Sequence, residues 1–267
     1  MGLLSRVFGR GAPQRGGGEA VPSPTELLYV VGATEGRADL LEPLLARIAD
    51  DAATRDRPGQ PAPRVVALGS HTGRGGQGLA ALDMLMAAEA RFGLAVEALL
   101  GPQEARLLEL LGGGTDGREW LLSGGIATLQ ECGIDARALA CSPDPGPWLA
   151  TALREAFGAR LGAIAGMAPS VRCGNLLLCS GGGEAGMRVE AQTRNALIFG
   201  PETDEAEILR EDGLVVVHAR PTGDGPGCGP QHIALDTGAA FSHQLAAARI
   251  ATDGAVVFLD VDRASQD

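Results

Sequence analysis

The chain has no lysine, so arginine supplies all 22 of its basic residues. The 33 acidic residues outnumber them, which gives a formal net charge of -11 at pH 7. Proteins that bind nucleic acids usually carry a segregated basic face that neutralises the phosphate backbone. No basic cluster of that kind is visible along this acidic sequence. We therefore expect no nucleic acid among its partners.

Cysteine is also scarce, and the five residues include no C-x-x-C pair: Cys132, Cys141, Cys173, Cys179 and Cys228. An odd number without that spacing argues against a disulfide framework and against a thiolate zinc site. No apolar run approaches the roughly 18 residues that span a membrane. The segment from Met1 to Arg10 is too short for a secretory signal. These absences predict a cytoplasmic protein.

Residues 1–24 are expected to form a flexible N-terminal tail, because a Gly- and Pro-rich tract runs from Gly11 to Pro24. Within residues 1–10, apolar side chains could share one face of a short helix, with Arg6 and Arg10 opposite. Two interpretations of this amphipathic peptide remain open. It is a frayed terminus, or it docks on a partner or on an anionic membrane surface. The second interpretation would place the protein at the periphery of a membrane or assembly.

From Leu27 onward, short apolar runs alternate with amphipathic helical patterns, which is typical of strand-helix-strand units in a largely parallel sheet. The expected strands are 28–31, 65–68, 94–100, 176–179, 214–218, 232–235, 244–250 and 255–259; the expected helices are 39–48, 77–92, 106–111, 119–130 and 147–161, with a loop at 51–63. We expect one domain over residues 25–263, with a helical insert at about 105–166. The fold class is α/β (α+β), with two packed sheets flanked by helices.

Glycine is abundant, with 40 of 267 residues, which is about twice the usual share. Many glycines lie in the segments that follow the expected strands: Gly32, Gly36, Gly69, Gly75, Gly101 and Gly181 to Gly183. In open α/β sheets, ligands bind in the crevice at the carboxyl ends of the strands, where glycine lets the backbone approach closely. The sequence therefore predicts a ligand site at these ends.

Five segments carry a resemblance to a known family: Gly32-Ala33-Thr34-Glu35-Gly36, Gly69-Ser70-His71-Thr72-Gly73-Arg74-Gly75, Gly101-Pro102-Gln103-Glu104, Cys179-Ser180-Gly181-Gly182 and His218-Ala219-Arg220-Pro221-Thr222. In order and spacing, the chain resembles the calcineurin-like metallophosphoesterases, and is most similar to bacterial Ser/Thr protein phosphatases and symmetrical diadenosine tetraphosphatases. Their patterns are G-D-I-H-G, G-D-x-x-D-R-G, G-N-H-E, H-A-G and H-G-H-T-P. The resemblance covers residues 27–261. It implies a four-layer αββα sandwich of two mixed sheets, and two divalent metals such as Mn or Fe/Zn.

The sequence departs from the family pattern at the positions that bind metal or take part in catalysis. The resemblance assigns family metal-ligand or catalytic positions to Ala33, Glu35, Ser70, Gly73, Pro102, Gln103, Ser180 and Arg220. A further family arginine aligns with Gly200, whereas Arg74 and Glu104 keep the family residue. Loss of even one residue that supports a ligand typically costs 10- to 100-fold in metal affinity or activity. We therefore expect no bound metal, no other cofactor and no catalytic residues at these positions.

Alternatives remain open for the polar residues that are left. Glu35, His71, Glu104 and His218 could build a substitute metal site, or they could make ordinary hydrogen bonds. Arg74, with Arg220, could bind a phosphate-type anion, or Arg74 could pair with Glu35 or Glu104. The Asp236-Thr237-Gly238 turn is expected to be a structural loop, as it is in the family.

The resulting hypothesis is a pseudophosphatase: a catalytically inactive metallophosphoesterase-like protein in a bacterial cytoplasm. It would act as a protein-binding, scaffold or regulatory subunit, with a protein or larger complex as its partner. One alternative is residual metal-dependent phosphoester hydrolysis, of the Ser/Thr phosphatase or dinucleoside polyphosphatase kind. Another is a sensor of phosphate or of a nucleotide.

Overall fold

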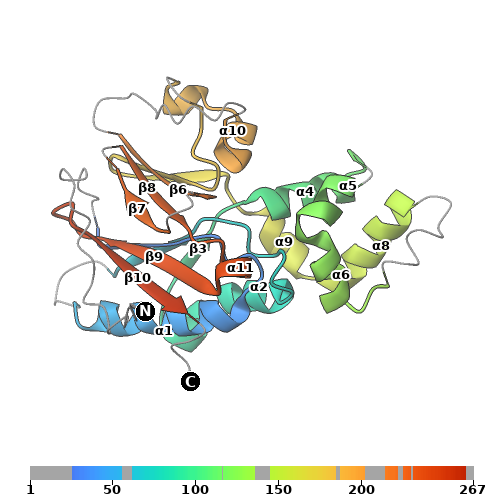
Figure 1. The fold of residues 1–267 in the computed structure, drawn as a ribbon, viewed down its shortest axis with the longest axis horizontal. Coiled ribbons are helices and arrows are strands. Elements are labelled where there is room, and N and C mark those ends of the chain that lie inside the picture. Colours follow the sequence, from blue (N-terminus) through green and yellow to red (C-terminus); the bar gives the residue numbers. More distant parts are fainter. Residues whose placement is uncertain are drawn as a thin grey trace, which may run out of the picture.

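A computed structural model describes residues 26–55, 62–115, 117–135, 145–184, 187–201, 214–221, 225–229 and 231–262. Two five-stranded sheets pack face to face, and helices lie on their outer faces (Figure 1). The expected arrangement of two mixed sheets flanked by helices is confirmed. The predicted tail at residues 1–24 lies outside the described residues.

The first sheet contains strands from both ends of the described chain: β1 (Leu28–Val31), β2 (Arg64–Ala67), β3 (Val96–Ala98), β9 (Gln244–Ile250) and β10 (Val256–Asp262). Their order is β10-β9-β1-β2-β3. β1 is parallel to β2 and β2 to β3, whereas β9 is antiparallel to both β1 and β10. The hairpin between β9 and β10 closes at Asp253-Gly254, where Gly254 has φ 81°, as that dipeptide predicts.

The second sheet has the order β4-β5-β6-β8-β7. Its strands are β4 (Ser170–Cys173), β5 (Leu176–Cys179), β6 (Val215–Pro221), β7 (Gly227–Cys228) and β8 (His232–Asp236). The three central strands, β5, β6 and β8, run parallel. The sequence prediction missed β4 and β7, which are short antiparallel edge strands without a continuous apolar run.

The core between the sheets is built from apolar side chains on alternate positions of the central strands. Its members include Leu28, Val30, Val66, Leu68, Leu176, Leu178, Val215, Val217, Ile233 and Leu235. Residues on the other face of the first sheet pack against α1 (Ala38–Ala53), α2 (Gly78–Met86) and α3 (Ala88–Phe92). On the far face of the second sheet, Leu197 of α10 (Arg194–Phe199) packs against Leu177 and Val216. Both faces of the parallel strands are therefore covered, which explains their continuous apolar runs.

The middle of the chain forms a helical group with its own core around Trp120 and Phe157. Its helices are α4 (Pro102–Leu111), α5 (Arg118–Trp120), α6 (Ile126–Glu131), α8 (Pro145–Phe157) and α9 (Arg160–Ala165). They lie to one side of the sheets (Figure 1). Two short elements complete the fold: a 3-10 turn at Val189–Ala191 and α11 (Ala239–Ser242).

The helix expected at residues 119–130 is not continuous, because a π-helical turn at Leu121–Gly125 separates α5 from α6. Within that turn Gly124 has φ 144°, which an L side chain rarely adopts. A Cβ atom at Gly124 would lie 2.9 Å from the Cα atom of Gly73. The irregular turn thus brings the helical group against the loop that follows β2.

The loop expected at residues 51–63 begins later than predicted, because Asp51 belongs to the last turn of α1. Its carboxylate accepts hydrogen bonds from the Tyr29 hydroxyl at 2.7 Å and from Arg249 at 2.9 Å. Burial opposes ionisation, but the hydrogen bonds from Arg55, Tyr29 and Arg249 outweigh it and lower the pKa of Asp51 to about 2. These long-range partners extend the helix beyond its local sequence signals.

Within the described ranges, none of the helices combines the length and apolar character needed to cross a membrane.

Candidate functional site

The segments that follow the parallel strands of both sheets line a cavity of about 460 Å³ that is open to solvent. We call it the strand-end cavity. Eight of the motif residues line it: Ala33, Glu35, Ser70, Arg74, Pro102 and Gln103 follow strands of the first sheet, Ser180 follows β5 and Arg220 lies near the end of β6. Residues from segments up to 187 positions apart therefore meet where the strand-end glycines predict a ligand site.

The residues of this cavity do not fit the two-metal centre that the family resemblance implies. Ala33 and Pro102 have no ligand atom in their side chains, and Ser70 and Ser180 offer only hydroxyl groups where carboxylate or imidazole would be needed. Arg220 brings a fixed positive charge into the same space. Across the described part of the chain, no three His, Cys, Asp or Glu side chains gather closely enough to hold a metal ion.

His71 and Glu104 are fully buried behind the cavity and make structural hydrogen bonds. Nε2 of His71 lies 3.0 Å from the carbonyl oxygen of Leu99, which can only accept, so Nε2 carries the proton. Oε1 of Glu104 accepts from the Thr72 backbone N–H at 2.9 Å and from its hydroxyl at 3.1 Å. The two side chains thus fasten the loop after β2 to the segment that joins β3 to α4.

His218 supports the backbone next to the cavity. Its ring stacks on His232 with centroids 5.9 Å apart, and its Nδ1 accepts the backbone N–H of Arg220 at 3.2 Å. Burial, assisted by the charges of His232 and Arg220, lowers the pKa of His218 to about 4. The imidazole is therefore neutral at neutral pH and can keep accepting that hydrogen bond.

Glu35, in the first motif, has an unusual environment. Its backbone is left-handed, with φ 50°, and its Oε2 atom is buried without a hydrogen-bond partner among the described residues. A Cβ atom at Gly73 would lie 2.8 Å from Oε2, so glycine at position 73 makes room for this carboxyl group. Burial raises the pKa of Glu35 to about 7; the charges of Asp236 and Glu104 add to the shift, and that of Arg74 opposes it.

Asp236 is a second carboxyl group in the wall of the cavity. Its Oδ1 accepts the backbone N–H of Gly238 at 2.8 Å, as a structural turn requires. Burial also raises the pKa of Asp236, against the effect of that hydrogen bond. The two acidic side chains of the cavity therefore hold their protons more tightly than exposed carboxyl groups do.

Three arginines line the same cavity as these two carboxyl groups: Arg74, Arg106 and Arg220. The side chain of Arg220 lies against Gly200, where a Cβ atom would be 3.2 Å from Nε and where φ is 92°. The missing side chain at position 200 thus leaves space for Arg220. Within the described ranges, the guanidinium groups of Arg74 and Arg220 make no hydrogen bond or ion pair, although Arg74 lies over the Phe241 ring at 5.8 Å.

Sequence reasoning missed several residues that line the cavity: Arg106, Ser123, Phe199 and Phe241. Ser123 is held by Gln103, whose Nε2 donates to the Ser123 carbonyl oxygen at 2.5 Å. Arg106 follows the third motif by two residues, and Phe199 precedes Gly200, so proximity to motif positions was a usable signal for both. Phe241 has no such signal in the sequence.

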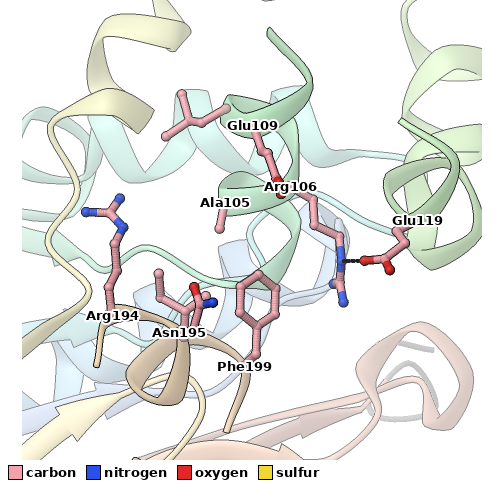
Figure 2. Close-up of a pocket in the computed structure, with 9 residues that line it drawn as sticks. Ala105, Arg106, Glu109, Glu119, Arg194, Asn195 and Phe199 are labelled. Carbon is pink, nitrogen blue, oxygen red and sulfur yellow. Dashed lines mark ion pairs between the residues drawn. The ribbon is translucent and has the colours of Figure 1, made fainter. Parts of the chain in front are cut away.

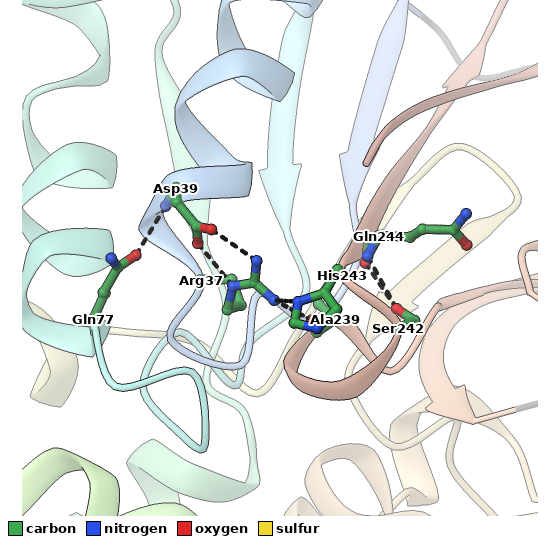
Figure 3. A network of polar contacts seen from close by, with 7 residues as sticks. All are labelled: Arg37, Asp39, Gln77, Ala239, Ser242, His243 and Gln244. Atoms are coloured by element: carbon green, nitrogen blue, oxygen red, sulfur yellow. Dashed lines mark hydrogen bonds and ion pairs between the residues drawn. The ribbon is translucent and has the colours of Figure 1, made fainter. Parts of the chain in front are cut away.

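A buried arginine, Arg37, contacts the segment from Ala239 to His243, which lies beside the strand-end cavity (Figure 3). Arg37 is paired with Asp39 at 2.7 Å and donates through Nη1 to the Ala239 carbonyl oxygen at 2.8 Å. The same nitrogen lies 2.9 Å from Nδ1 of His243, which must accept because arginine can only donate. These contacts secure both ends of α11, and Phe241 projects from it with 74% of its surface exposed.

No protein-family model matches the chain, and no curated protein matches it in sequence. Solved structures do match. A proposed diadenosine tetraphosphatase has a TM-score of 0.56 and 16% identity, over 92% of this chain and 100% of that chain. A cold-active protein tyrosine phosphatase of a psychrophilic Shewanella species has a TM-score of 0.51 and 16% identity, over 88% of this chain and 80% of that chain. A serine/threonine phosphatase from Saccharomyces cerevisiae has a TM-score of 0.52 and 10% identity, over 90% of this chain and 80% of that chain.

These neighbours are phosphatases, and identities this low establish the fold alone. The chain shares the fold of these solved phosphatases, as its motif order predicts.

Proposed function

We propose that this protein is a pseudophosphatase that binds a phosphate-type anion in the strand-end cavity without hydrolysing it, and that it acts as a sensor or regulatory subunit. The observation that carries the proposal is the charge inside the cavity. Three arginines line it, whereas its two carboxyl groups have raised pKa values. A cavity with excess positive charge in a chain of net charge -11 favours an anionic ligand.

The chemistry of the arginines supports the same ligand. A guanidinium group matches phosphate or sulfate with two parallel hydrogen bonds. Arg74 and Arg220 come from the two different sheets, so a bound anion would lie between them and link the two halves of the sandwich. The replaced ligand positions support binding without hydrolysis, because they offer no carboxylate pair to hold the metal ions that activate water in such enzymes.

Titration calorimetry with inorganic phosphate tests the proposal. We expect Arg74→Ala and Arg220→Ala each to weaken binding roughly 10- to 100-fold, because a hydrogen bond to a charged group contributes about 1.5–3 kcal/mol. Arg91→Ala is the matched control: Arg91 lies on α3 and pairs with Glu42, away from the cavity, so its loss is expected to leave phosphate affinity unchanged. Failure of the wild-type protein to bind phosphate would contradict the proposal.

A hydrolysis assay tests whether the protein lacks phosphatase activity. We expect no turnover of p-nitrophenyl phosphate by the purified protein with Mn²⁺. Turnover together with stoichiometric bound metal would favour the alternative of residual hydrolysis through Glu35, and Glu35→Ala would then have to abolish it.

The affinity for sulfate is expected to fall roughly tenfold as pH rises through about 7, because ionisation of Glu35 places a negative charge beside the bound anion. Sulfate is the suitable probe since it keeps its charge over this range, whereas phosphate does not. Calorimetry between pH 5.5 and 8.5 measures the effect, and Glu35→Gln is expected to flatten the profile. An affinity that rises with pH would contradict the assignment.

A protein-binding or scaffold role in a cytoplasmic assembly is the second candidate. The side chains of Phe199 and Phe241 favour it, since both line the strand-end cavity and are 38% and 74% exposed. Exposed aromatic residues beside a cavity are typical anchors for a partner. Capture experiments from the native host with and without residues 1–24 would show whether the N-terminal segment takes part.

A further inference from the structure

A second cavity, of about 480 Å³, lies between α4 and α10, next to the strand-end cavity (Figure 2). We call it the helix cavity. Arg106, Ile198 and Phe199 line both cavities, so these three side chains form the partition between them. Glu119 and Arg194 lie on the helix-cavity side only. The partition therefore decides whether a ligand in one cavity can extend into the other.

Arg106 is the polar member of the partition, and weak contacts hold it in place. Its Cζ atom lies 4.8 Å from the centre of the Phe199 ring. Its Nε atom is 3.5 Å from Oε2 of Glu119, which is too long for a well-formed hydrogen bond. Nε is buried and has no hydrogen-bond partner among the described residues. The side chain of Glu119 is 83% exposed, and ion pairs with an exposed carboxylate contribute little.

An anion in the strand-end cavity would offer Arg106 stronger partners than those it has. Hydrogen bonds from guanidinium to phosphate are charge-assisted and are about twice as strong as neutral ones. The unpartnered Nε atom would gain an acceptor, and the loss of the long contact to Glu119 would cost little. The exchange is therefore favourable whenever an anion lies within reach of the cavity wall that Arg106 forms.

We propose that Arg106 is a movable partition and the third arginine of the anion site. When an anion binds, its guanidinium leaves Glu119 and the Phe199 ring and turns to the anion, and the two cavities join. The ring face that it uncovers then accepts a flat group. The ligand class that this geometry fits is an organic anion with its charged head among Arg74, Arg106 and Arg220 and a planar body on Phe199. This inference rests on the proposed anion binding.

Calorimetric titrations of the full chain with inorganic phosphate test the movement of Arg106. Arg106→Gln is expected to weaken phosphate binding at least roughly tenfold. Glu119→Gln removes the competing carboxylate and is expected to tighten binding twofold to fivefold, but only while Arg106 is present. Glu119 is at the surface, so this variant should fold even if Arg106→Gln does not. Arg194→Gln, in the helix cavity alone, is the control and should bind phosphate like wild type.

Phenyl phosphate tests the joining of the cavities. We expect the wild-type protein to bind it more tightly than inorganic phosphate, and Phe199→Leu to remove most of that preference, measured as the ratio of the two affinities in each protein. Normal phosphate binding that is unchanged in both Arg106→Gln and Glu119→Gln would overturn this inference and leave the proposed function intact. Failure of the wild-type protein to bind either compound would overturn the proposed function itself.

Discussion

Replacing Gly101 with alanine is expected to destabilise the protein by at least about 3 kcal/mol, or roughly 6–12 °C in Tm. A Cβ atom at this position would lie 2.0 Å from the backbone nitrogen of Ser70 and 2.7 Å from the carbonyl carbon of Gly69. Both are backbone atoms, which cannot rotate away as the end of a side chain can. The loops after β2 and β3 would have to separate, and with them the wall of the strand-end cavity that contains Ser70 and Pro102.

Thermal or urea unfolding followed by circular dichroism measures this effect. Gly162→Ala is the matched control, because Gly162 lies within α9 and a Cβ atom there would meet nothing within 4 Å. Alanine favours a helix interior by about 1 kcal/mol over glycine, so the control should be unchanged or slightly more stable. If Gly101→Ala had the same unfolding midpoint as the wild-type protein, that result would contradict the close packing of the loop after β2 against the loop after β3.

Glu35→Gln is expected to stabilise the protein by up to about 3 kcal/mol at pH 8, with a much smaller effect at pH 5. The pKa of Glu35 is raised from 4.5 to about 7 in the folded state, mainly by burial. The folded protein therefore binds this proton more tightly than the unfolded chain does. As pH rises from about 4.5 to 7, the free energy of unfolding falls, and above 7 the loss is complete. Glutamine carries no charge and avoids the loss.

Denaturant unfolding at pH 5 and pH 8, without phosphate or sulfate, measures the difference. Glu155→Gln serves as the control, since that side chain is exposed on α8 and its replacement should alter stability equally at both pH values. A Glu35→Gln variant that is less stable than wild type at pH 8 would show that the ionised carboxylate has a partner that compensates its burial.

The strand-end glycines and the motif order predicted which loops line the strand-end cavity. The carboxyl ends of parallel strands converge at one edge of a sheet, so residues such as Ser70 and Pro102 had to lie near each other. Strand ends and motif order do not show which contacts each of these side chains makes. In the sequence, Gly73 stands where the family pattern has an aspartate. In the structure, the absence of a side chain at Gly73 leaves room for the carboxyl group of Glu35.

The sequence left open whether His71 and Glu104 bind a metal or make ordinary hydrogen bonds, and their burial in the structure favours hydrogen bonding. His71 and Glu104 are as hydrophilic as any surface pair, and nothing in their spacing shows that both are fully buried. Their hydrogen bonds to Leu99 and Thr72 follow from the way the loops pack. The raised pKa of Glu35 has the same origin, since solvent exclusion by distant segments is its largest cause.

By itself, the sequence determined the central strands, the helices that cover them and the edge at which the ligand positions gather. These features depend on apolar periodicity and on residues close together in the chain. Only the tertiary structure decided that Arg220 occupies the space beside Gly200 and that Arg106 rests on Phe199 between two cavities. Contacts of this kind join elements that dock through many weak interactions, so no local pattern encodes them. The lack of lysine determined that every cation in these cavities is an arginine, and the packing determined which of them meet.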